Sequence, residues 1–271
     1  MTAAEDVFTD THRRYLDNWN VINSLRQFRD AAQPYAEQGL AAQYGQMLDF
    51  AATDPEYSKI FSGGDKPLSA EVRQMIQGFI TETVITNANA AVDATSIVFA
   101  QSILDDCAWS YLKVCAMVCP DDWESLIDAK KVDLRTMREQ KYEAIRAELI
   151  EAKLNQLERE SLITKIDLLF SLCRPPTDYA PIGHYQYDRE RLLRIDKDRH
   201  GIIHQSAFNT ALPNVEDDLL YISKTAWFIM GLVNQRYGLR IDMRRFMKLQ
   251  TPTPEEQPEE LILGKPVIST L

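Results

Sequence analysis

The chain has 271 residues, 45% of them hydrophobic and 9% aromatic, which suits a globular protein with a substantial core. Its formal net charge of −10 argues against a general nucleic-acid coat but leaves room for a local basic groove. The four cysteines form no C-x-x-C pair, so we expect free thiols in a reducing cytosol. No N-terminal hydrophobic segment and no apolar run approaching about 18 residues occur, so we expect a cytoplasmic protein that does not contact a membrane.

The first third of the chain is expected to contain three helices. Apolar positions at helical spacing predict one over about residues 11–32, which Pro34 closes, and a second over about 35–52. A Gly- and Pro-rich loop follows, and Ser69 caps the third helix. Two asparagines near its middle mark a weak break, so we place a domain boundary there and expect residues 1–88 to form an N-terminal helical extension.

Residues 89–250 are expected to form an up-and-down helical bundle, so the fold class is all-α. Between Val92 and Val118 apolar residues recur in steps of three and four, which is typical of a bundle helix. The residues expected to begin the later helices are Asp133, Ser161, Asp188 and the pair Pro213–Asn214. Residues 251–271 form a Pro/Glu-rich tail.

The helix that begins at Asp188 carries an anomaly. Its apolar row Leu192, Ile195, Arg199, Ile202 steps by three, four and three, so Arg199 lies where packing alone would place a leucine. A guanidinium on a buried row costs free energy unless it is paired or faces a polar ligand. We therefore look for chemistry at Arg199.

The sequence from Arg199 to His204, RHGIIH, resembles the R-x-x-x-x-H motif of the HEPN family (higher eukaryotes and prokaryotes nucleotide-binding). These are small all-helical domains, and many are metal-independent ribonucleases that work as dimers. The runs SIVFAQSILDDCAWSYLKV and SLITKIDLLFSLC also look like core helices of that family, and the resemblance covers about residues 90–238. It implies a HEPN-like bundle, a homodimeric endoribonuclease, a toxin or antiphage setting, and an antitoxin or regulatory protein as a further partner.

The resemblance assigns catalysis to Arg199 and His204. In such an enzyme a base removes the ribose 2′-hydroxyl proton as the oxygen attacks the adjacent phosphate, which leaves a 2′,3′-cyclic phosphate. Histidine suits this step because imidazole ordinarily titrates near about 6.5, and arginine stays charged and binds phosphate oxygens bidentately. His200 stands where the family commonly has another polar residue, and it would support the site by binding phosphate or holding His204.

Basic residues near the motif are candidates for binding the RNA backbone, because a local positive patch in an acidic chain suits phosphate. They are Arg194 and Lys197 on the motif helix and Arg236, Arg240, Arg244 and Arg245 further along the chain. The alternative is ordinary solvated charge at the end of a helix.

Other interpretations of the motif stay open. Arg199 could pair with Asp196, Asp105 or Asp106, which would fit a non-catalytic HEPN-like module that binds protein or nucleotide, or a helical scaffold with an accidental motif match. His200 and His204, four residues apart, could ligate a metal, but a zinc site would need a third ligand from His184 or a distant acidic residue. We therefore expect no catalytic metal and no cofactor.

Overall fold

The computed structural model describes residues 2–54, 69–127, 141–176, 179, 185–205 and 212–247. Its elements in chain order are α1 (Ala3–Thr53), α3 (Ala70–Val118), the 3-10 helix η1 (Pro120–Trp123), α5 (Tyr142–Glu158), α6 (Leu162–Cys173), α7 (Arg189–Gln205), α8 (Val215–Tyr237) and α9 (Met243–Phe246). These residues contain no β-strand, which confirms the all-α prediction.

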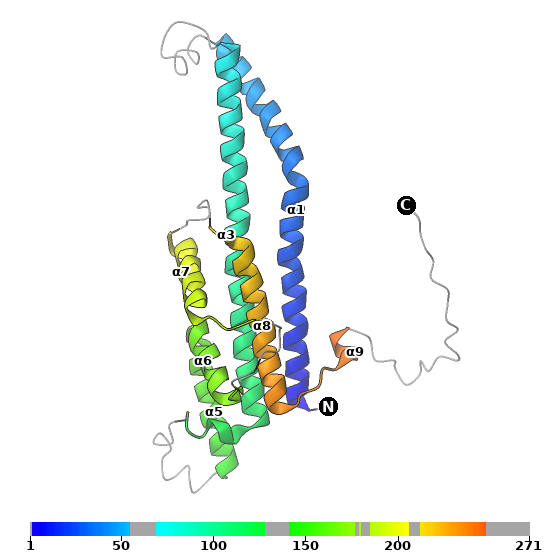
Figure 1. Cartoon of the computed structure of the whole chain (residues 1–271), viewed down its shortest axis with the longest axis vertical. Helices are drawn as coiled ribbons and strands as arrows, with labels where there is room; N and C mark the ends of the chain where they lie inside the picture. The colour runs from blue at the N-terminus through cyan, green and yellow to red at the C-terminus, as the bar shows by residue number, and fades with distance from the viewer. Residues whose placement is uncertain are drawn as a thin grey trace, which may run out of the picture.

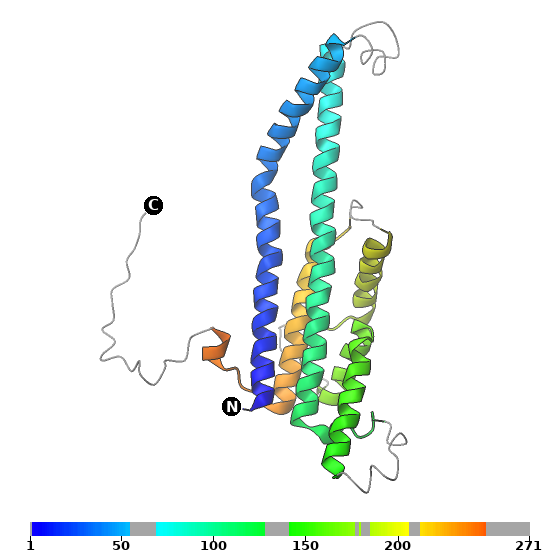
Figure 2. The ribbon, with the colours of Figure 1, turned by 180° about the vertical axis from the view of Figure 1, so that it is seen from behind.

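Two very long helices dominate the molecule. α1 has 51 residues and α3 has 49, and they lie side by side as a hairpin whose far end rises well beyond the other helices (Figures 1 and 2). Polar contacts tie the two helices together along this length, including an ion pair from Arg29 to Asp93 at 2.6 Å. The lower halves of both helices belong to the bundle.

The prediction of two separate helices before residue 53 is wrong, because α1 continues through Pro34. A proline inside a helix lacks an N–H donor and costs about 3 kcal/mol. Continuing the helix lets Leu48 and Ala51 become buried against α3, and packing of this kind offsets the penalty. The visible consequence is that α1 bends in its upper half (Figure 1).

The expected domain boundary near residue 88 falls inside α3, which is unbroken there. Asn89, taken as part of a weak break, donates a hydrogen bond to Gln33 of α1 at 3.3 Å. Moreover, Phe8, Tyr15 and Ile22 of α1 lie in the same hydrophobic core as the bundle helices. The first half of α1 is therefore a core element of the bundle, and only the upper part of the hairpin extends from it.

The lower half of α3 forms the centre of the bundle, in contact with α1, α5, α6, α7 and α8. The predicted apolar row on this helix is confirmed from Ile97 to Val114, since each of its members is at most 2% exposed. The row ends at Val118, which is 38% exposed at the last turn. The lower half of α3 is therefore a buried bundle helix, as its spacing predicted.

Two predicted helix starts are confirmed by their capping hydrogen bonds. The hydroxyls of Ser69 and Ser161 accept from the backbone N–H groups of Val72 and Thr164, at 3.3 and 3.2 Å. Asn214 directly precedes α8, as expected. The predicted start at Asp133 and the tail 251–271 lie outside the described residues.

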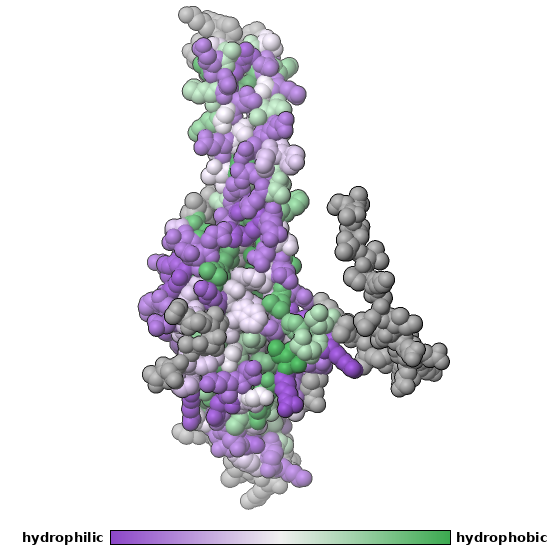
Figure 3. All heavy atoms as spheres, turned by 45° about the vertical axis from the view of Figure 1, so that its right-hand side comes forward, coloured by the Kyte–Doolittle hydropathy of each residue, from purple (hydrophilic) through white to green (hydrophobic). Residues whose placement is uncertain are grey.

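The surface of the hairpin mixes polar and apolar side chains (Figure 3). Large apolar residues more than half exposed on it are Val21, Phe28, Tyr35, Met47, Phe50, Met75 and Phe79. Within the described ranges, no helix combines the length and apolar character needed to cross a bilayer.

Candidate active site

The motif lies on α7, which packs against α3 and α6. Asp188 caps this helix as predicted, because its carboxylate accepts a hydrogen bond from the Arg191 backbone N–H at 3.0 Å. Leu192, Ile195 and Ile202 are at most 2% exposed, so the predicted apolar row is confirmed. The row fixes how α7 is rotated about its axis, and with it the direction of the motif side chains.

Arg199 interrupts that buried row. Its side chain is 33% exposed, while its Nε atom is buried and makes no hydrogen bond within the described part of the chain. A carboxylate oxygen of Asp196 lies 3.5 Å from this Nε, one turn earlier on the same helix. Among the described residues, Arg199 is therefore held at the edge of the core by a weak intrahelical ion pair, and its side chain stays partly accessible.

Two of the three predicted structural partners of Arg199 are engaged elsewhere. Both carboxylate oxygens of Asp105 accept from Lys165 at 2.8 Å, and Asp106 accepts from Arg14 at 3.2 Å. Lys165 is only 1% exposed and lies on the apolar face of α6, where an unpaired charge would be very costly. Sequence reasoning missed this pair, although a lysine on an otherwise apolar row was a visible signal.

His200 and His204 both lie on the solvent side of α7. Their rings contact each other, with centroids 4.1 Å apart and planes inclined at 45°. Residues four apart on a helix stack over one turn, which explains the contact. Gly201 between them has nothing within 4 Å of an added Cβ, so the helix surface beside the rings is open.

Arg199 and His204 do not converge within one chain. Five residues along a helix correspond to a rotation of about 140° and a rise of about 7.5 Å, so the two side chains leave α7 on different sides. The solvent side also presents Leu193 and Ile203, which are 36% and 45% exposed. A single protomer thus displays both imidazoles beside apolar area, and Arg199 borders this face.

Arg194, a predicted RNA contact, takes part in a clamp between α7 and α8. One carboxylate oxygen of Asp218 accepts from Arg191 at 2.9 Å and from Arg194 at 2.6 Å, and the Asp218 side chain is only 5% exposed. The hydrogen bond to Asp218 raises the pKa of Arg194. Tyr221 completes the clamp, since its hydroxyl donates to the backbone carbonyl of Asp188 at 2.6 Å.

The other predicted RNA contacts lie in two separate places in the structure. Lys197 is exposed on α7. The C-terminal arginines lie at the far end of α8, a helix of 23 residues and about 34 Å whose first turn holds the clamp (Figure 1). The structure therefore does not bring Arg236, Arg240, Arg244 and Arg245 together with Arg199 and His204.

Two of these arginines have carboxylate partners. Arg236 pairs with Asp122 at 3.2 Å, and Arg245 pairs with Asp6 at 3.3 Å and with Asp10. The Arg245 guanidinium lowers the pKa of Asp10 through its hydrogen bond. Arg245 thereby fastens α9 to the first turns of α1.

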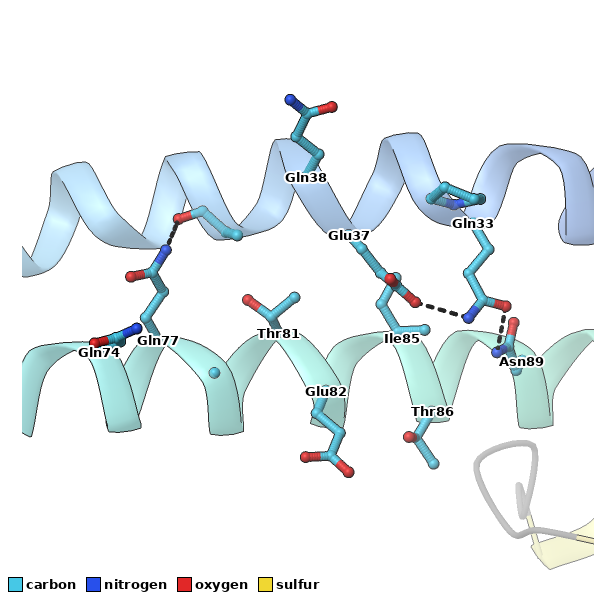
Figure 4. Close-up of a pocket in the computed structure, with 13 residues that line it drawn as sticks. Gln33, Glu37, Gln38, Gln74, Gln77, Thr81, Glu82, Ile85, Thr86 and Asn89 are labelled. Atoms are coloured by element: carbon cyan, nitrogen blue, oxygen red, sulfur yellow. Dashed lines mark hydrogen bonds between the residues drawn. The ribbon is translucent and has the colours of Figure 1, made fainter.

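A polar groove of about 800 Å³ opens between the upper parts of α1 and α3 (Figure 4). Gln33 donates to Glu37 at 2.7 Å, and Gln77 donates to the backbone carbonyl of Ala41 at 2.5 Å (Figure 4). The groove is lined mostly by amide and hydroxyl side chains, and none of the predicted catalytic residues lines it. The groove arises where polar residues replace the apolar seam of the hairpin.

In the parts of the chain that the structure covers, no group of three or more His, Cys, Asp or Glu side chains is arranged to hold a metal ion. The described cysteines are free thiols, and Cys107, Cys115 and Cys173 are buried. No family model, curated protein or solved structure matches the chain.

Proposed function

We propose that this protein is a HEPN-type endoribonuclease that cuts RNA without a metal ion and leaves a 2′,3′-cyclic phosphate. The observation that carries the proposal is the placement of Arg199. It occupies a position on the buried row of α7, yet within the described residues its Nε makes no hydrogen bond, and its ion pair with Asp196 spans 3.5 Å. Partly burying a guanidinium without a hydrogen-bond partner costs free energy, and hydrogen bonds to the phosphate oxygens of a ligand would offset that cost.

In this proposal His204 is the base that takes the ribose 2′-hydroxyl proton, and Arg199 binds the phosphate oxygens on which negative charge develops. His204 is exposed, so an RNA strand has access to its ring. His200, in ring contact with His204, positions it or binds phosphate. The proton passes from the attacking oxygen to an imidazole, and a protonated imidazole returns one to the 5′-oxygen that leaves.

The proposed enzyme is a homodimer whose two α7 helices face each other. Arg199 and His204 point in different directions on one helix, and an isologous contact would bring the arginine of each chain toward the histidine of the other. Leu193 and Ile203, both partly exposed on this face, would contribute apolar area to the contact. Light scattering that finds an RNA-cutting monomer at micromolar concentration would exclude this composite site.

A second candidate is a non-catalytic HEPN-like module that binds protein or nucleotide. The ion pair from Arg199 to Asp196 favours it, because a structural arginine also keeps a carboxylate partner. Under the first proposal, the enzyme would act in the cytoplasm as a toxin or an antiphage effector, and an antitoxin or another regulatory protein would be its partner.

The two candidates are separated by incubating the purified chain with a mixed RNA pool in excess chelator. We expect cleavage by the wild type and by Glu190→Ala, a control at an exposed position of the same helix, and none by Arg199→Ala or His204→Gln. His204→Gln keeps the size and the hydrogen-bonding capacity of the side chain, so it isolates proton transfer. Circular dichroism should find all four proteins equally helical. An inert wild type that still binds nucleotide or a protein partner would favour the second candidate.

A further inference from the structure

We propose that His200 and His204 form a bidentate site for a divalent transition-metal ion on the exposed side of α7. The two imidazoles lie one helical turn apart with ring centroids separated by 4.1 Å. Two histidines at this spacing on one helix face supply paired nitrogen ligands without any rearrangement of the backbone. This ion is distinct from a catalytic metal, which the proposed reaction does not use.

The distance between the rings suits chelation. Imidazole nitrogens bind zinc at about 2.0–2.1 Å, which places the centroids of two rings on one ion about 5 Å apart. The observed separation is about 1 Å smaller, and small rotations about the side-chain torsions of two exposed residues can supply the difference. Both rings are accessible to solvent, and Gly201 leaves the adjacent helix surface open to the ion's water ligands.

The surroundings indicate an exchangeable site. Structural zinc centres take four protein ligands, whereas no third His, Cys, Asp or Glu joins this pair within the described residues. The remaining coordination positions would hold water. Imidazole donors suit Ni²⁺, Cu²⁺ and Zn²⁺, and oxygen-preferring Mg²⁺ is expected to bind this pair poorly.

Binding at this site would inhibit the enzyme, an inference that rests on the proposed function. A histidine that ligates a metal uses the lone pair with which it would otherwise accept a proton. His204 with an ion bound therefore cannot serve as the base, while Arg199 remains unaffected. Without a bound ion, His204 would act as the base. With an ion bound, His200 and His204 would act as its ligands.

The test is calorimetric titration of the full-length chain with Ni²⁺ in the absence of RNA. Ni²⁺ is the better probe because the chain has four cysteines, whose thiolates bind zinc readily. We expect His200→Ala and His204→Ala each to weaken binding at least about tenfold, since even losing a residue that only supports a ligand costs that much. Glu190→Ala is the matched control, because Glu190 is exposed on the same helix and belongs neither to the metal site nor to the proposed dimer contact, and its affinity should equal that of the wild type.

Ring signals in the NMR spectrum give an independent readout. The chain has four histidines, and Zn²⁺ should shift the ring signals of His200 and His204 while those of His12, which is buried, stay in place. Unchanged Ni²⁺ affinity in both histidine variants would overturn the site. Since neither titration contains RNA, metal binding by a chain that cuts no RNA would refute the proposed function alone. Cleavage by a chain without Ni²⁺ affinity would refute the metal site alone.

Discussion

The clamp between α7 and α8 predicts a large effect of Asp218→Ala. The Asp218 side chain is 5% exposed, and one of its oxygens accepts from Arg191 at 2.9 Å and from Arg194 at 2.6 Å. Hydrogen bonds to charged groups contribute about 1.5–3 kcal/mol each. Arg191 and Arg194 are 32% and 42% exposed and regain water when the carboxylate is removed, so we discount each to roughly 1 kcal/mol.

Including the loss of packing at a buried position, we expect Asp218→Ala to lower the free energy of unfolding by about 2–3 kcal/mol. At about 2–4 °C per kcal/mol, the melting temperature should fall by about 4–12 °C in a calorimetric or circular-dichroism scan.

Asp198→Ala is the matched control for this change. Asp198 pairs with the same Arg194 at 3.2 Å, but its side chain is 37% exposed and lies one turn away on the same helix. An exposed pair of this kind contributes at most about 0.5 kcal/mol. Equal losses of stability in Asp198→Ala and Asp218→Ala would refute the reasoning that burial makes the clamp important.

Further predictions concern stability and are checked by urea unfolding. Asp105→Ala should cost about 3–5 kcal/mol because it leaves Lys165 buried without a partner, whereas Lys165→Met should be much milder. Pro34→Ala should stabilise α1 by up to about 3 kcal/mol, and a loss of stability would show that the bend is needed. Burial lowers the pKa of His12, so the unfolded chain binds more protons, and stability should fall as the pH drops below about 6.5. His12→Phe should remove that part of the pH dependence.

Features set by local sequence were predictable. The buried face of α7, the caps Ser69 and Ser161, and the apolar row of α3 all follow from spacing within one helix. The spacing of apolar residues indicates which face of a helix is buried, whichever element packs against that face. The all-α fold and the exceptional position of Arg199 could therefore be found before the structure was known.

Features set by distant contacts were missed. The continuity of α1 through Pro34 depends on packing against α3, which the local proline rule does not take into account. The partners of Arg194 and Arg245 lie 24 and 235 residues away in sequence. Composition alone made these arginines look unpaired, whereas Arg194 pairs with Asp218 and Arg245 pairs with Asp10.

The central claim is that the 2′-hydroxyl of RNA is the nucleophile. Its most direct test uses an RNA oligonucleotide with a single 2′-deoxy substitution at a mapped cut site, incubated with the wild-type chain in excess chelator. The proposal predicts that this strand stays intact, and that the unmodified strand yields a 2′,3′-cyclic phosphate and a free 5′-hydroxyl. Cleavage at the deoxy position, or products that bear a 5′-phosphate, would show that an activated water attacks and would contradict the roles given to Arg199 and His204.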